Sequence, residues 1–216
     1  MNPGEVTPLA GRVSFHCHSF ANEYELDYDG DGVKESRILM LDLEMTGLDP
    51  VRDRIIEVAC FVVEGDTLLP VPGAELELAV MPNDPSLLDR MDEWNTRTHN
   101  ESGLIRRIME KGVSIREAEK EIMNLLNEHM SKGAIICGNS IHWDRIYIRQ
   151  ELPAVDDFCT FRMIDVSSIK ELLRRIDSDG PRYYKRSPHT ALADAKGSLE
   201  ELRFYVERYI NKDFDQ

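Results

Sequence analysis

Asp42 and Glu44 are the residues whose types and spacing first suggest chemistry in this chain. They stand two apart in the otherwise apolar run 38–45. Residues i and i+2 of an extended strand point to the same face, so both carboxylates project from one side of a predicted buried strand. Two like charges there lose hydration and repel, at a cost of several kcal/mol. A divalent ion with oxygen ligands relieves that cost, so the pair indicates a metal site.

Two later segments supply more acids and a histidine. Asp144 follows a short apolar run that is typical of a strand, and Asn139 or Ser140 is placed to cap a helix with Asp144 in its first turns. Asp194 lies at the margin of the apolar stripe of a predicted C-terminal helix. A five-residue step does not place two side chains on one helix face, so we expect His189 on the loop that enters this helix. Each residue alone also fits a helix cap or a helix dipole, and only their combination points to chemistry.

A family resemblance rests on these residues. The pattern Asp42-x-Glu44, Asp144 and His189-x-Ala191-x-x-Asp194 resembles the four acids and one histidine of the DEDD exonuclease superfamily, in its histidine-containing branch. Longer motifs, in order and at plausible spacings over about residues 37–210, resemble the oligoribonuclease family. They are Leu41–Pro50, Asp92–Asn95, Gly138–Ile141 and Arg162–Ser167.

The resemblance implies a 3′-to-5′ exoribonuclease that degrades very short RNA oligonucleotides to nucleoside 5′-monophosphates by two-metal-ion hydrolysis. It implies that Asp42 bridges both ions, that Glu44 and Asp194 hold one, and that Asp144 serves the other, partly through water. It implies that His189 is the general base for the attacking water. An all-oxygen ligand set suits Mg²⁺ or Mn²⁺.

Substrate contacts are also implied by the resemblance. Leu48 resembles a wedge inserted between bases, Trp94 resembles the platform on which a base stacks, and His99 is expected near the site.

A cap for the 5′ phosphate is implied at Ser140, Arg162 and Ser167, where an arginine suits the two oxygens of a phosphate. The family places a tyrosine, contributed across a homodimer interface, where this chain has Phe161. Phe161 cannot donate the corresponding hydrogen bond.

The elements that must position these residues form one predicted α/β domain. It is a ribonuclease-H-like mixed sheet of about five strands with helices on both faces, whose first three strands are antiparallel. The predicted strands are 37–44, 54–63, 74–81, 134–138 and 159–164. The predicted helices are 86–93, 101–111, 114–131, 142–151, 167–176 and 189–209. The predicted exonuclease domain is 37–211, between a polar extension (1–36), whose composition is compatible with disorder, and a short tail (212–216).

The charge of the chain bears on its substrate. The 216 residues include 40 acidic and 26 basic ones, for a net charge of −14. Proteins that grip long nucleic acid need a basic surface, so this balance favours very short oligonucleotides over duplex DNA, although a local basic patch is compatible with it. A DNA proofreading or repair exonuclease shares the acid set and is the alternative, but we expect it to carry a more basic groove.

A second alternative, a non-catalytic calcium- or nucleic-acid-binding module, rests on the acidic turn 27–32. It resembles half of an EF-hand loop but has Ile38 where the loop requires glutamate. A non-catalytic module would be expected to have a broken acid set, whereas Asp42, Glu44, Asp144 and Asp194 are all present here. The neighbouring His16-Cys17-His18 offers soft metal ligands, but adjacent residues rarely converge on one ion.

The cysteines and hydropathy bear on the compartment. Four cysteines without a C-x-x-C pair favour a reducing compartment, with Cys60 and Cys137 buried. No apolar segment reaches 18 residues, so we expect no membrane span. The expected location is cytoplasmic, with a mitochondrial one as the alternative.

Overall fold

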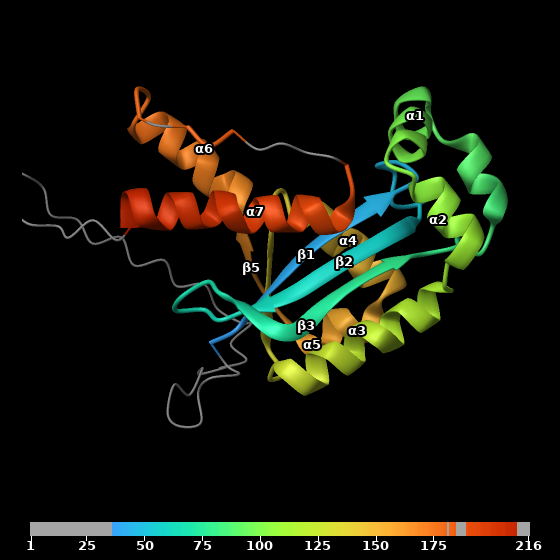
Figure 1. Cartoon of the computed structure of the whole chain (residues 1–216), viewed down its shortest axis with the longest axis horizontal. Helices are drawn as coiled ribbons and strands as arrows, with labels where there is room; N and C mark the ends of the chain where they lie inside the picture. The colour runs from blue at the N-terminus through green and yellow to red at the C-terminus, as the bar shows by residue number, and fades with distance from the viewer. Residues whose placement is uncertain (1–35, 181, 185–188, 211–216) are drawn as a thin grey trace, which may run out of the picture. The chain divides into compact units, whose positions relative to one another are not determined.

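The computed structural model describes residues 36–180, 182–184 and 189–210, and its centre is a five-stranded sheet of order β3-β2-β1-β4-β5 (Figure 1). The strands are β1 (Ile38–Met45), β2 (Ile55–Val63), β3 (Pro70–Ala79), β4 (Ala134–Gly138) and β5 (Cys159–Asp165). The β1–β2 and β2–β3 pairs are antiparallel, whereas β1–β4 and β4–β5 are parallel. The predicted mixed sheet with three antiparallel strands first is confirmed.

The helices follow the predicted order with local differences. They are the 3₁₀ helix η1 (Pro85–Arg90), α1 (Glu93–Glu101), α2 (Leu104–Lys111), α3 (Ile115–His129), α4 (His142–Glu151), α5 (Pro153–Phe158), α6 (Val166–Ile176), α7 (Ala191–Tyr205) and the π-helical η2 (Val206–Ile210). The predicted helix 101–111 is wrong at its start, because Gly103 adopts φ +74° there and separates α1 from α2. Helices α1 and α5 were not predicted.

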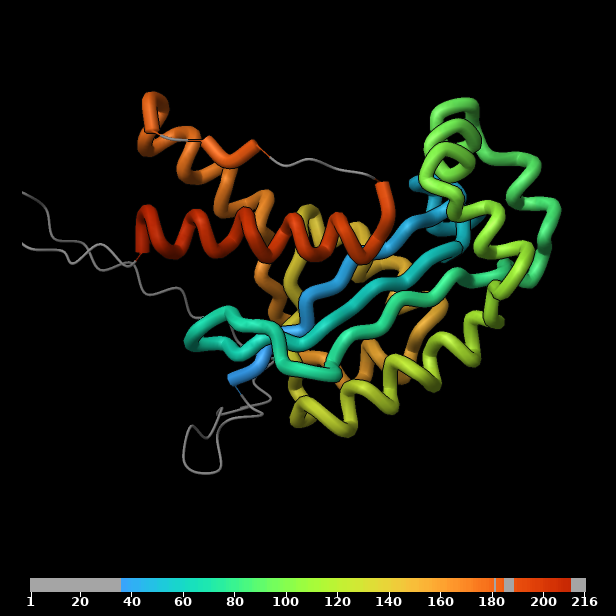
Figure 2. Tube along the Cα trace, in the orientation of Figure 1, coloured from blue at the N-terminus to red at the C-terminus, as the bar shows by residue number. Residues whose placement is uncertain are grey.

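The alternation of side chains along β1 decides on which face the chemistry lies. Leu39, Leu41 and Leu43 belong to the core cluster on the face covered by α3, α4 and α5. Ile38 and Met40 belong to the second cluster, which includes residues of α6 and α7. Asp42 and Glu44 continue the second series, so they project to the face on which α7 packs against β1 and β2 (Figure 2).

Several predicted features lie outside the described residues. They are the extension 1–36 apart from Ser36, with its acidic turn 27–32 and His16-Cys17-His18, and the tail 212–216. Within the described part, Cys60 and Cys137 are free and buried, as predicted, and so is Cys159. No helix among the described residues is both long and apolar enough to cross a membrane.

Candidate active site

Three carboxylates converge where the central strand meets α7. Oxygen atoms of Asp42, Glu44 and Asp194 all lie within 4.8 Å of one another. Asp42 and Glu44 come from β1, and Asp194 comes from the first turn of α7, where it is buried. Three hard oxygen ligands from two rigid elements suit a divalent cation, as the sequence predicted.

Asp144 lies beside this cluster and is bonded to the same strand. It stands in the first turn of α4, is buried, and its Oδ1 accepts a hydrogen bond of 2.9 Å from the Leu43 backbone N–H. Leu43 separates Asp42 from Glu44, so the fourth acid is held at the middle of the Asp-x-Glu pair.

The predicted cap of α4 is wrong. The N-cap residue is Ile141, which provides no side-chain hydrogen bond. Ser140 adopts a left-handed conformation (φ +53°), and its side chain bonds to Ser167 instead.

Burial strongly perturbs two of the four acids. Burial, together with the negative charges of Glu57, Asp194 and Asp144 and against a smaller effect of Arg107, raises the pKa of Glu44 to about 8. Burial also raises the pKa of Asp144 to about 7, although the Leu43 N–H favours its charged form. The protein alone therefore does not balance the charge of this site, which fits a site completed by a bound cation.

His189 lies on the loop before α7, as predicted, five residues before Asp194, and is exposed. It has a left-handed backbone conformation (φ +55°), which is uncommon for a residue other than glycine. Its ring meets Trp94 edge-on, with 5.7 Å between the ring centroids. Trp94 lies in α1 and is 51% exposed, so it leaves room for a ligand to stack.

The other two residues predicted to lie near the substrate, His99 and Leu48, flank the end of β1. His99 of α1 is fully buried, with Nε2 3.2 Å from the Met45 carbonyl oxygen, and burial lowers the pKa of His99. Leu48 lies in the turn after β1 and is 65% exposed. An exposed leucine at this end of β1 is available to contact a base.

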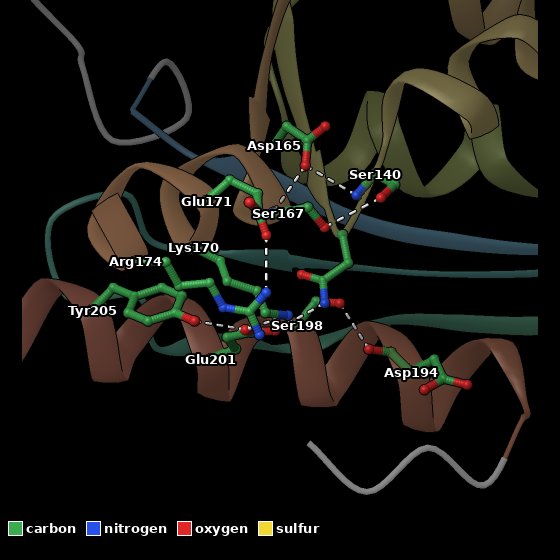
Figure 3. A network of polar contacts seen from close by, with 11 residues as sticks. Ser140, Asp165, Ser167, Lys170, Glu171, Arg174, Asp194, Ser198, Glu201 and Tyr205 are labelled. Atoms are coloured by element: carbon green, nitrogen blue, oxygen red, sulfur yellow. Dashed lines mark hydrogen bonds and ion pairs between the residues drawn. The ribbon is translucent and has the colours of Figure 1, made fainter. Parts of the chain in front are cut away.

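Two of the three residues predicted to hold the 5′ phosphate lie around one carboxylate. Asp165 Oδ1 accepts hydrogen bonds of 2.9 Å from the backbone N–H groups of Ser140 and Ser167, and the two serine hydroxyls are 3.2 Å apart (Figure 3). Arg162 is exposed on β5 and lies over the ring of Phe161, with its guanidinium carbon 5.1 Å from the ring centroid.

Glu57 is a residue of the site that sequence reasoning missed. It is fully buried in β2, opposite Glu44 in the strand pair. Its Oε1 lies 2.5 Å from Arg107 of α2, and its Oε2 accepts a hydrogen bond of 2.9 Å from the Ala191 N–H. Burial raises the pKa of Glu57, whereas these two partners lower it. Its signal in the sequence is a single acid inside the apolar run Ile55–Val63.

Comparison with known proteins agrees with this geometry. A family model described as exonuclease (RNase_T) matches residues 39–202. The oligoribonuclease of Bordetella pertussis is 41% identical over 181 residues, which cover 82% of this chain and 97% of that protein. The oligoribonuclease of Halorhodospira halophila is 40% identical over 183 residues, with 83% and 97% covered. The chain belongs to the oligoribonuclease family. It is a metal-dependent 3′-to-5′ exonuclease that hydrolyses phosphodiester bonds.

Solved structures share the fold of this family member at low sequence identity. A metal-free E. coli Exonuclease I–ssDNA complex matches with a TM-score of 0.62 at 14% identity, covering 81% of this chain and 40% of that one. Cell-death related nuclease 4 matches with a TM-score of 0.57 at 11% identity, covering 80% and 64%. The chain thus spans about two fifths of Exonuclease I, and these likenesses concern the fold alone.

Proposed function

We propose that the enzyme degrades very short single-stranded RNA from the 3′ end and releases nucleoside 5′-monophosphates. The observation that carries this proposal is the convergence of Asp42, Glu44 and Asp194, with Asp144 bonded to the Leu43 N–H between the first two. The His189 ring, on the loop that enters α7, meets Trp94. The relatives that cover most of the chain are named oligoribonucleases. The net charge of −14 fits a substrate with few phosphates.

The proposed metal ions are two Mg²⁺ or Mn²⁺ per site. Asp42 would be shared between them, with Glu44 and Asp194 on one ion and Asp144 on the other. Bound ions of this kind stabilise charge on the reacting phosphate and lower the pKa of a coordinated water. The raised pKa values of Glu44 and Asp144 support a doubly positive occupant.

The chain's own residues supply proton transfer and orientation. His189 accepts a proton from the attacking water, since imidazole exchanges protons near neutral pH. Trp94 offers a ring face to a base, and Leu48 separates that base from its neighbour. His99 holds the end of β1 through its contact with the Met45 carbonyl oxygen.

The proposed 5′-phosphate cap limits the length of the substrate. Ser140, Ser167 and Arg162 would hold the terminal phosphate, and Arg162 can present two N–H groups to it. A longer RNA cannot reach both the cap and the metal site, so the enzyme favours the shortest oligonucleotides.

A second copy of the chain is the proposed partner at β5. This strand is the last in the sheet order and leaves one edge unpaired in the described chain. Phe161 and Met163 of β5 are 70% and 36% exposed. Exposed apolar side chains on an edge strand favour association, and a homodimer would cover them.

The decisive experiment is turnover of end-labelled RNAs of two to ten nucleotides, beside matched DNAs, with Mg²⁺ and with a chelator. We expect Mg²⁺-dependent decay that is fastest on the shortest RNAs. Equal rates on long duplex DNA would reject this function in favour of a DNA repair exonuclease, and turnover that persists with the chelator would reject the metal mechanism.

A further inference from the structure

A buried carboxylate outside the metal site joins three parts of the molecule. Glu201 of α7 is fully buried. Its oxygens accept hydrogen bonds from Tyr205 Oη at 2.7 Å and Asn139 Nδ2 at 2.8 Å, and lie 2.9 Å from Lys170 Nζ (Figure 3). Burial alone would raise the pKa of Glu201, but these three donors outweigh it and the pKa lies below its ordinary value. Glu201 is therefore held as an anion.

Two of the three donors, Asn139 and Lys170, come from segments that carry the proposed 5′-phosphate cap. Asn139 directly precedes Ser140, and Lys170 lies three residues after Ser167 in α6. Both therefore connect the serine pair to α7.

The same helix carries a metal ligand. Glu201 lies two helical turns after Asp194, and between them the Ser198 hydroxyl donates a hydrogen bond of 2.9 Å to the Asp194 carbonyl oxygen. A single rigid helix therefore spans from the acid cluster to Glu201.

We infer that Glu201 is a positioning residue that fixes the 5′-phosphate cap at a set distance from the metal-binding end of α7. It thereby helps to determine which length of RNA can occupy both ends of the site. Asp165 holds the two serines to each other, and Glu201 holds that unit to the helix of Asp194. The inference rests on the proposed function, since it takes Ser140 and Ser167 to bind the terminal phosphate.

A buried charge suits this task better than a neutral contact would. Hydrogen bonds to an ionised group are stronger and more directional than neutral ones, and the loss of a donor leaves the charge under-compensated. Displacement of the Asn139 turn or of α6 away from α7 is therefore costly.

The test compares variants that change the bonds or the charge of Glu201. Asn139→Ala removes the donor next to the cap, and Glu201→Gln removes the charge. Tyr205→Phe is the matched control, because it removes an equally short bond that lies within α7 and joins no second element. For each protein, kcat and KM are measured with Mg²⁺ on a dinucleotide RNA with and without its 5′ phosphate, and thermal stability is measured in parallel.

We expect Asn139→Ala and Glu201→Gln to lower the preference for the 5′-phosphorylated substrate about tenfold, the scale of one charged hydrogen bond, mainly through KM. Both should also discriminate less between two- and four-nucleotide RNAs. Tyr205→Phe should keep the preference within about twofold of the wild type, even where its loss of stability is similar.

Each other outcome is informative. A wild-type preference that survives Asn139→Ala and Glu201→Gln overturns this inference while the proposed function stands. So does an equal loss in Tyr205→Phe, which would show that only general stability matters. A wild-type enzyme that is indifferent to the 5′ phosphate overturns the cap itself, and this inference with it.

Discussion

At the scale of single residues, the acid cluster is stable in its charged form only when a cation balances it. Burial and neighbouring carboxylates raise the pKa of Glu44 from 4.5 to about 8. The protein without metal therefore binds a proton that the unfolded chain releases at a lower pH. Metal binding, proton binding and folding stability are therefore linked.

The first prediction is a pH dependence of the metal-free enzyme. A raised carboxyl pKa contributes stability that is complete below the ordinary value of 4.5 and is lost as the pH rises through about 8. We expect the melting temperature in chelator to fall by roughly 3–6 °C across that window. Glu44→Gln should flatten this decline, and Mg²⁺ at pH 8 should reverse it in the wild type. A metal-free wild type whose stability rises over the same window would contradict the assigned environment of Glu44.

The second prediction concerns Asp42, which is proposed to bind both metal ions. Asp42→Asn should abolish metal binding and reduce turnover on the order of a thousandfold or more. In chelator it should raise the melting temperature by about 2–4 °C, because one of the clustered charges is gone. Calorimetric titration with Mn²⁺ and thermal unfolding measure both effects. The control is Asp157→Asn, which neutralises an exposed acid outside the cluster and should change neither metal binding nor the melting temperature.

The third prediction separates the proposed base from the metal ligands. His189→Ala should bind Mn²⁺ with unchanged affinity while kcat falls roughly 10²–10⁴-fold, the range for loss of a general base. Calorimetric titration with Mn²⁺ and single-turnover rates on a dinucleotide RNA measure the two effects. Retention of most of the activity would remove His189 from this role.

At the scale of elements, α7 is fastened to the sheet by a side chain from a neighbouring strand. Thr190, the N-cap residue of α7, makes no side-chain cap, and Glu57 of β2 instead accepts the N–H of Ala191. Arg107 balances the charge of Glu57 and also lies 3.1 Å from Glu77 of β3. The first turn of α7, with Asp194, is thus tied to β2 and through Arg107 to α2.

The fourth prediction tests this arrangement by removing the balancing charge. Arg107→Met should cost about 3–5 kcal/mol of unfolding free energy, because it leaves Glu57 buried without its cation. Adding Glu57→Gln to Arg107→Met should recover part of that loss, since the uncompensated charge is removed as well. Urea unfolding of the two single variants and the double variant measures the coupling. Additive losses would show that the pair does not act as a unit.

The placement of the acids and of His189 on their elements could be predicted from the sequence, because it depends on local spacing. The two-residue spacing of Asp42 and Glu44 placed them on one face, and the five-residue step from His189 to Asp194 placed the histidine on the loop before the last helix. The break at Gly103 depends on one backbone conformation within a helical pattern, which periodicity does not detect.

Partners between distant segments could not be predicted in the same way. The apolar run of β2 makes Glu57 unusual, but the sequence around it does not predict that Arg107 and Ala191 are its partners. Ser140 appeared suited to a helix cap, and the tertiary bonds to Asp165 and Ser167 prevailed over that local preference.

At the scale of the whole molecule, the open edge of the sheet is where the proposed dimer forms. Phe161 lies on that edge, 70% exposed and in contact with Arg162 of the proposed cap. Association at β5 would therefore influence the site that binds the terminal phosphate.

The fifth prediction is that Phe161→Glu weakens association and cap binding together. A charge in an apolar contact should raise the dimer dissociation constant about a hundredfold, which corresponds to about 3 kcal/mol. KM for a 5′-phosphorylated dinucleotide should rise as the dimer dissociates. Mass measurement in solution and kinetics at matched concentrations test it, with Leu172→Glu, an exposed apolar position on α6, for comparison. A fully active monomer would refute the shared site.

The carboxylate cluster joins β1, the first strand of the described chain, to α7, its last α-helix. During synthesis, Asp42 and Glu44 leave the ribosome long before Asp194 does. A nascent chain therefore holds only part of the acid cluster until α7 has followed. Metal-dependent turnover should begin only once α7 packs on β1, so the order of the elements makes the site one of the last features of the fold to be completed.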